Sequence, residues 1–411
     1  MADISTCPPL TRSSVQAAHA LIAPHIHRTP VLTCSTLTRL ASTPQDASSP
    51  LFTPSTPGAA PASPKINLLF KCENTQRIGA FKARGAFHAL SRLRQTSPEL
   101  LEKGVITHSS GNHAQALALA AREFGVKATI VMPEISTKSK IEGTRSQGAE
   151  VVFSGSTSVE REAVVKRLMD ERGMTLVPPY DHPDVILGQG TLALELEGQA
   201  REMLGGYRGA GRGRGGCSFA AGRGLEGQGT NGTTNGATNG TTDGTTNGTT
   251  KGLDAVIAPC GGGGMLSGVA TALDGTGIRV FGAEPSFQGA DDATRGVAAG
   301  KRVESVKTLT IADGLRTPLG EITWKVVSDK EKVKGFYSVT EEQIKAAMRL
   351  MLERAKIFIE PSAAVGVAVA LYNEEFRSMV EIEAGPNGWD VGVVLTGGNT
   401  TMEAIAKLFA S

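Results

Sequence analysis

The hydrophobic positions of this chain form short apolar runs that alternate with longer stretches of helical periodicity. The apolar runs predict strands at residues 66–71, 104–107, 127–132, 150–153, 175–177, 253–259, 280–283 and 390–396. The periodic stretches predict helices at residues 15–23, 85–93, 114–124, 138–147, 159–172, 190–204, 266–273, 340–354, 362–372 and 402–409. This alternation is typical of parallel sheets covered by helices, so the sequence predicts an α/β fold.

Two segments interrupt the alternation. Residues 43–64 are rich in Pro, Ser and Thr, and we expect a flexible insertion there. Residues 205–252 combine Arg-Gly spacing with a four-residue repeat of the type Thr-Asn-Gly-Thr, which predicts a low-complexity, disordered insertion. Expansion of a repeat in a surface loop is the interpretation that we favour, and RNA binding by the Arg-Gly part is the alternative.

Composition and charge narrow the class of protein. The chain has 411 residues, a formal net charge of +2 and 40% hydrophobic residues, which allows two domains or one bilobal enzyme. The near balance of charge gives no reason to expect nucleic-acid or membrane partners, and no apolar run reaches membrane-spanning length. The N-terminus lacks a secretory pattern, and none of the five cysteines forms a Cys-x-x-Cys pair. These features predict free thiols and a cytoplasmic location.

One lysine has the setting of a catalytic amine. Lys82 follows the predicted strand 66–71 and begins a helical stretch. A helix N-terminus carries partial positive charge, which disfavours an ammonium and lowers its pKa. A neutral amine at that position is suited to forming a Schiff base with a carbonyl compound.

Two further turns precede helices and are suited to binding anions. Residues 108–115, HSSGNHAQ, offer hydroxyls and backbone N–H groups to a carboxylate, or act simply as a helix cap. Residues 261–265, GGGGM, allow the backbone to close around a phosphate in front of a helix. The glycine loop matches neither a dinucleotide fingerprint nor a P-loop.

Together, the lysine motif GAFKARGA, the SSGNH turn and the GGGGM loop resemble the fold-type II pyridoxal-phosphate (PLP) enzymes, and within them the serine racemase and serine/threonine dehydratase family. Further matching motifs are GAEP at 282–285, DGLRT at 313–317, IEPSA at 359–363 and LTGGN at 395–399. The resemblance implies a two-lobed, three-layer parallel-sheet fold and a homodimer. The expected domains are a large lobe at 1–109 and 187–411 and an inserted small lobe at 110–186.

The resemblance also implies roles for individual residues. Lys82 would bind PLP covalently and move the proton at the substrate Cα, with Ser110 as the second base on the opposite face. The cofactor would be held by Phe81, Lys82, Asn112, Gly261, Gly262, Gly263, Gly264, Met265 and Thr396. The substrate would be held by Ser109, Ser110, Gly111, Asn112, His113 and Arg161.

A metal site and an effector site are implied in the same way. Glu284, the Ala290 carbonyl and Asp292 resemble the family's divalent-cation ligands, and such oxygen ligands suit Mg²⁺ or Ca²⁺. The linking turn at 287–289 is longer than in the mammalian pattern. ATP is the expected effector, with Gln115 matching the family site while Arg77 and Cys34 replace a lysine and a serine.

The expected activity is racemisation of serine together with elimination of ammonia from small 3-hydroxy amino acids. Two bases on opposite faces allow inversion at Cα, whereas Lys82 alone allows elimination. Because dehydratases also carry serine at the position of Ser110, a serine, threonine or 3-hydroxyaspartate dehydratase without racemase activity stays open. A pseudoenzyme with an interaction role and a cysteine-synthase-like enzyme are the remaining alternatives.

Overall fold

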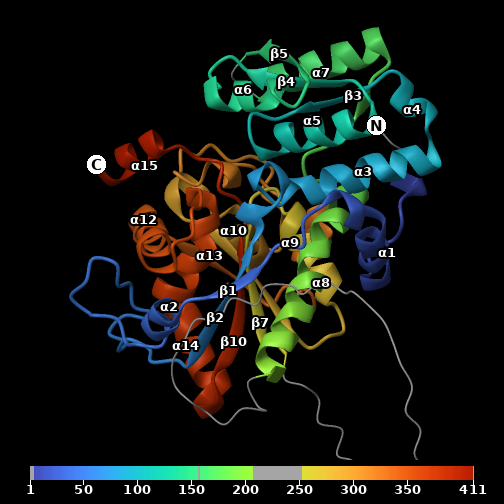
Figure 1. Ribbon diagram of the computed structural model, residues 1–411. Helices are drawn as coiled ribbons and strands as arrows, with labels where there is room; N and C mark the ends of the chain where they lie inside the picture. Colours follow the sequence, from blue (N-terminus) through green and yellow to red (C-terminus); the bar gives the residue numbers. More distant parts are fainter. Residues whose placement is uncertain (1–3, 137, 156–157, 207–251, 411) are drawn as a thin grey trace, which may run out of the picture.

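The computed structural model describes residues 4–136, 138–155, 158–206 and 252–410, and these form two sheets covered by helices (Figure 1). The larger sheet has the order β1-β2-β10-β7-β8-β9. All neighbouring strands are parallel except β1, which pairs antiparallel with β2. The strands are β1 Val31–Thr33, β2 Ile66–Cys72, β10 Trp389–Leu395, β7 Ala255–Pro259, β8 Arg279–Pro285 and β9 Gly335–Val339.

The smaller sheet is parallel throughout and has the order β5-β4-β3-β6. Its strands are β3 Val105–His108, β4 Ala128–Pro133, β5 Glu150–Ser154 and β6 Thr175–Leu176. β3 belongs to this sheet although it precedes residue 110, where the sequence predicts the small lobe to begin, and the lobe boundaries stay a prediction. The α/β fold expected from the sequence is confirmed.

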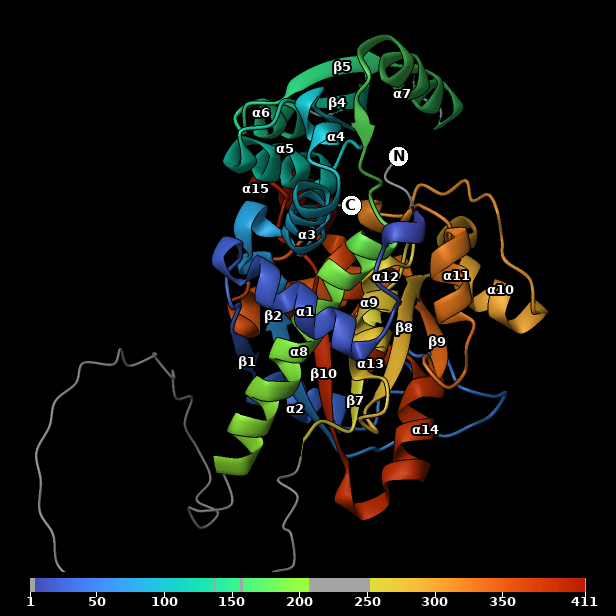
Figure 2. The ribbon, with the colours of Figure 1, turned by 90° about the vertical axis from the view of Figure 1, so that its right-hand side faces the viewer.

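The helices cover both faces of the larger sheet. α1, α8 and α9 pack on one face, and α2, α12, α13 and α14 on the other (Figure 2). The helices are α1 Arg12–Ile22, α2 Ser35–Ala41, α3 Lys82–Thr96, α4 Glu99–Glu102, α5 Asn112–Phe124, α6 Lys138–Arg145, α7 Ser158–Arg172, α8 Pro183–Gly206, α9 Gly264–Leu273, α10 Asp292–Ala299, α11 Glu321–Val327, α12 Glu341–Leu350, α13 Pro361–Tyr372, α14 Glu374–Ala384 and α15 Met402–Ala410.

The first of the two predicted insertions is anchored to the fold at both of its ends. Residues 43–64 contain no helix or strand, but the fully buried Arg377 donates hydrogen bonds to the carbonyls of Thr43 and Ala62, at the two ends of the segment. The low-complexity segment lies outside the described residues apart from its ends. It leaves at the end of α8 and returns before β7, at the amino end of the parallel strands.

The structure can be compared with two expectations, one about the cysteines and one about membrane-spanning segments. Cys7, Cys34, Cys72 and Cys260 are free thiols, as expected, while Cys217 lies outside the described residues. Within the described part of the chain, no helix combines the length and the apolar character that crossing a membrane requires.

A buried network of charges joins α3 to α8 and to the larger sheet. Arg84 donates to Glu73 Oε2 at 2.7 Å and to Glu195 Oε1 at 2.8 Å. Lys71 donates to Glu195 Oε2 at 2.7 Å. All four side chains are buried, with two positive and two negative charges. Because buried charges are stable only when paired, this network fixes the start of α3, which carries Lys82.

We expect Arg84→Met to lower the free energy of unfolding by about 3–5 kcal/mol, because the carboxylates of Glu73 and Glu195 lose a buried partner. Denaturant unfolding followed by circular dichroism measures the change. Arg354→Met, at an exposed position, is the matched control and should change stability by less than about 0.5 kcal/mol. Equal effects of the two substitutions would show that the network does not stabilise the fold.

Candidate active site

The residues expected to form the site converge at the carboxyl ends of the strands in the larger sheet. Lys82 follows β2, the glycine loop follows β7, and Thr396 follows β10, three neighbouring strands of that sheet. This edge is where parallel α/β sheets bind ligands. An isolated bridge between Ala80 and Gly397 joins the lysine segment to the Thr396 segment.

Lys82 is the first residue of α3, and its side chain is half-buried. Nζ donates a hydrogen bond to the Pro179 carbonyl at 2.7 Å and lies 5.2 Å from the centroid of the Phe81 ring. Burial lowers the pKa of Lys82 from 10.5 to about 8. The direction agrees with the sequence prediction, but desolvation rather than the helix terminus is the cause.

The glycine loop is shaped so that no side chain would fit. A Cβ on Gly262 would lie 2.6 Å from the ring of Tyr180, and one on Gly264 would lie 2.9 Å from the Tyr180 carbonyl oxygen. Gly263 adopts φ +82° and precedes the first turn of α9. Backbone N–H groups at this turn are suited to a phosphate, since the helix terminus lies behind it.

Thr396 has a hydroxyl that fits the cofactor. Oγ1 is buried and has no hydrogen-bond partner among the residues described. Such a group costs free energy unless a ligand satisfies it. The Thr396 carbonyl accepts a hydrogen bond from the backbone N–H of Phe81 at 3.1 Å, which places the two expected cofactor contacts side by side. PLP therefore fits this site, which offers the amine of Lys82, a glycine loop without side chains and the unsatisfied hydroxyl of Thr396.

Asn112 is held by two residues that were not among the predicted site residues. Its Nδ2 donates to Glu360 Oε1 at 2.9 Å, and its Oδ1 accepts from Asn399 Nδ2 at 2.8 Å. Glu360 is buried, and burial together with the charge of Asp313 raises its pKa to about 7. The IEPSA and LTGGN motifs contain both residues, but only the fold shows that they orient Asn112.

The turn before α5 presents backbone and hydroxyl groups, while its histidine turns inward. Gly111 N–H donates to Ser109 Oγ at 3.2 Å, and Ser110 is half-buried. His113 is 2% exposed and its Nε2 lies 3.2 Å from the Val177 carbonyl oxygen. Burial lowers the pKa of His113 to about 3, so the ring is neutral. His113 would therefore contribute to a carboxylate site through its backbone rather than its ring.

Arg161 lies on α7, close enough to His108 to influence its ionisation. Burial is the main cause that lowers the pKa of His108, while the charge of Glu162 raises it and the charge of Arg161 lowers it. His108 directly precedes the Ser109–His113 turn, so α7 brings Arg161 to the same end of β3. Its role in substrate binding stays a prediction.

Two buried carboxylates occupy the expected cation site. Glu284 accepts hydrogen bonds from the Ala293 and Thr294 N–H groups and from Thr294 Oγ1, whereas Asp292 Oδ2 is buried without a hydrogen-bond partner in the described part of the chain. Burial is the main cause that raises the pKa of Glu284 to about 8 and that of Asp292 to about 6. The pair fits a hard divalent cation, since a cation would offset this buried charge.

Comparison with known proteins gives a consistent picture. The family model "Pyridoxal-phosphate dependent enzyme" matches residues 50–252 and 245–397. A serine racemase of Arabidopsis thaliana is 35% identical over 400 residues, which cover 97% of this chain and 96% of that protein. An L-threo-3-hydroxyaspartate ammonia-lyase of Saccharomyces cerevisiae is 37% identical over 346 residues, with coverages of 84% and 86%. The structure of maize serine racemase superposes with a TM-score of 0.73 at 33% identity, covering 97% of each chain.

We expect the apoprotein to capture PLP faster as the pH rises, with a midpoint at about 8, because only the neutral amine of Lys82 attacks the aldehyde. The visible absorbance of the lysine-bound cofactor measures the rate. N-α-acetyl-lysine with PLP is the control, since its amine ionises at about 10.4. A midpoint for the protein equal to that of the control would mean that burial does not tune Lys82.

Proposed function

The chain belongs to the pyridoxal-phosphate dependent enzyme family, and from this premise we propose that it racemises serine and eliminates ammonia from serine, threonine and similar 3-hydroxy amino acids. The observation that supports the proposal is the lowered pKa of Lys82, together with the glycine loop and the unsatisfied Thr396 hydroxyl that follow neighbouring strands of the same sheet. The activities of the relatives favour an enzyme over the pseudoenzyme alternative.

The residues of the site supply binding and proton transfer. When bound, PLP stabilises the negative charge that develops at the substrate Cα. Lys82, with its lowered pKa, accepts the Cα proton on one face and returns a proton after reaction. Backbone N–H groups of the turn before α5 bind the substrate carboxylate. Thr396 offers a neutral hydroxyl to the ring nitrogen, and a hydroxyl does not hold that nitrogen protonated as a carboxylate would.

Ser110 decides between the two outcomes in this proposal. A hydroxyl on the face opposite Lys82 delivers a proton that inverts Cα, whereas its absence leaves elimination. The second candidate is a dehydratase without racemase activity, and the similarity to a 3-hydroxyaspartate ammonia-lyase favours it. Both candidates use Lys82 in the same way, so they differ only in the fate of the proton at Cα.

The remaining elements of the proposal rest on the family resemblance. Glu284, the Ala290 carbonyl and Asp292 would bind Mg²⁺ or Ca²⁺, and the enzyme would be a cytoplasmic homodimer without nucleic-acid partners. ATP as an effector has less support. Arg77, which replaces a lysine of that site, pairs with Glu123 and donates to the His25 carbonyl.

We expect the PLP-loaded enzyme to convert L-serine to D-serine and to pyruvate. Ser110→Ala should remove D-serine formation and retain pyruvate, because only inversion needs a second proton donor. Chiral chromatography measures D-serine and a coupled assay measures pyruvate. Lys82→Ala is the control and should remove both products.

Pyruvate without D-serine from the unsubstituted enzyme would select the dehydratase alternative. Absence of both products, despite a Lys82-dependent absorbance of bound PLP, would contradict the proposed function.

We expect Mg²⁺ or Ca²⁺ to raise the thermal unfolding midpoint, and to do so more strongly as the pH rises from about 6 to about 8. The raised pKa values mean that protons compete with the cation at lower pH. Differential scanning fluorimetry measures the shift. Asp292→Asn should remove it, whereas Asp291→Asn, at the neighbouring carboxylate that pairs with Arg295, should retain it. A shift that persists in Asp292→Asn would place the cation elsewhere.

A further inference from the structure

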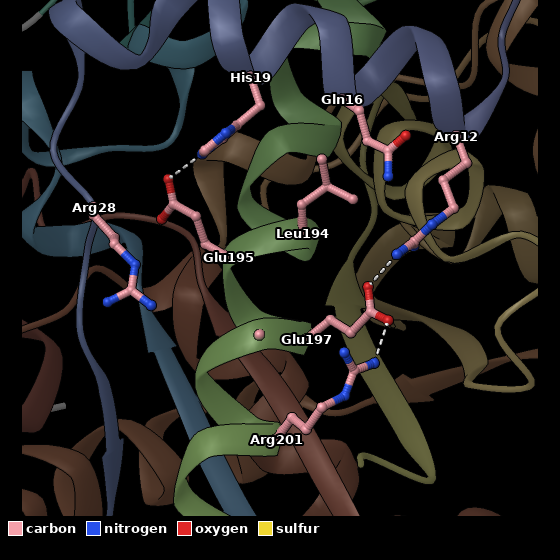
Figure 3. Close-up of a pocket in the computed structure, with 9 residues that line it drawn as sticks. Arg12, Gln16, His19, Arg28, Leu194, Glu195, Glu197 and Arg201 are labelled. Atoms are coloured by element: carbon pink, nitrogen blue, oxygen red, sulfur yellow. Dashed lines mark hydrogen bonds and ion pairs between the residues drawn. The ribbon is translucent and has the colours of Figure 1, made fainter. Parts of the chain in front are cut away.

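A cavity of about 370 Å³ opens between α1 and α8, formed by residues other than those of the candidate active site (Figure 3). The chain segment before β1 closes one side of it with Arg28. Its lining is mostly charged, with Leu194 as its one large apolar side chain. The lining residues are Arg12, Gln16, His19, Arg28, Leu194, Glu195, Glu197, Gly198 and Arg201.

The two acidic residues of the cavity are already neutralised. Glu195 forms part of the floor, and its charge is matched from beneath by Lys71 and Arg84 of the buried network. Glu197 is shared by Arg12 at 2.6 Å and by Arg201 at 3.0 Å (Figure 3). Two guanidinium groups therefore face a single carboxylate, which leaves one positive charge in excess at this end of the cavity.

Arg28 supplies positive charge at the other end. Its guanidinium approaches Glu202 at 3.5 Å, and both side chains are more than half exposed, at 59% and 71%. An ion pair of this kind contributes little stability. In Figure 3, Arg28 lies on the opposite side of Leu194 from Arg12, and no interaction connects it to another lining residue drawn there. Guanidinium groups with donors to spare are suited to phosphate or carboxylate groups.

We propose that this cavity is a binding site for a small organic molecule that carries two anionic groups, one contacting Arg28 and the other contacting Arg12 and Arg201. The site is independent of the proposed reaction and of the residues Cys34, Arg77 and Gln115. Phosphorylated metabolites and dicarboxylic acids share the required chemistry. The volume of the cavity lies within the range of small-molecule sites.

The cavity connects to the lysine helix through side chains. His19 Nε2 lies 3.3 Å from Glu195 Oε1, which also accepts from Arg84 Nη1 at 2.8 Å. Arg84 stands two residues after Lys82 on α3. His19, Glu195 and Arg84 therefore link the cavity to the helix that carries Lys82.

The test is isothermal titration calorimetry on the PLP-loaded, full-length enzyme with two probes, inorganic pyrophosphate and succinate. Buffers contain no added divalent cation and are matched in ionic strength with KCl, because screening alone changes weak ion pairing. PLP occupies the glycine loop, so that loop does not bind the probe. The variants are Arg28→Gln and Arg201→Gln, and the exposed Arg354→Gln is the matched control. Circular dichroism and PLP absorbance verify folding.

We expect saturable binding of at least one probe, with an affinity that falls about tenfold in each of the two variants and is unchanged in the control. Tighter binding of pyrophosphate identifies a phosphorylated ligand, and tighter binding of succinate identifies a dicarboxylic acid. The inference is overturned if neither probe binds saturably, or if Arg28→Gln and Arg201→Gln bind as tightly as the unsubstituted enzyme. Loss of racemase and lyase activity would not affect either outcome.

Discussion

The pairing of Arg84 with Glu73 and Glu195 is the constraint on which the site depends. Burying a guanidinium between two carboxylates costs free energy unless the groups are paired by well-formed hydrogen bonds. Here Arg84 pairs with both carboxylates, and Lys71 neutralises the remaining negative charge at Glu195. This network of ion pairs holds β2, α3 and α8 in fixed positions relative to one another. Because Lys82 begins α3, this network sets its position relative to the sheet together with the hydrogen bond from the Phe81 N–H to the Thr396 carbonyl.

The segment between β6 and α8 connects α3 to other parts of the site through contacts of three consecutive residues. The Pro179 carbonyl accepts from Lys82, and Tyr180 packs against the glycine loop. Asp181 then accepts three hydrogen bonds of 3.0 Å from the first N–H groups of α11. This irregular stretch thus contacts the Lys82 amine, the glycine loop and a helix of the larger sheet in consecutive residues. The smaller sheet and the larger sheet are therefore joined at the candidate active site.

Much of the fold and the centre of the site follow from local sequence. The strands before Lys82 and the glycine loop are mostly apolar runs, and the four glycines indicate a turn that becomes specific only together with the lysine and SSGNH motifs. Glu360 could not be found this way, because its partner Asn112 lies 248 residues away in the chain. The sequence pattern predicts no helix at α14, where Glu374 and Arg377 are buried as an ion pair. α8 begins at Pro183, before the predicted start at residue 190, and proline is tolerated in the first turn of a helix.

The place where the low-complexity segment joins the fold has a consequence for engineering. It leaves after α8 and returns before β7, at the amino ends of strands whose carboxyl ends carry the reactive groups. Loop-closure entropy grows only slowly with loop length, and the ends of the segment make no part of the site. An affinity tag, a fluorescent reporter or a second protein domain inserted at this junction should leave the chemistry untouched.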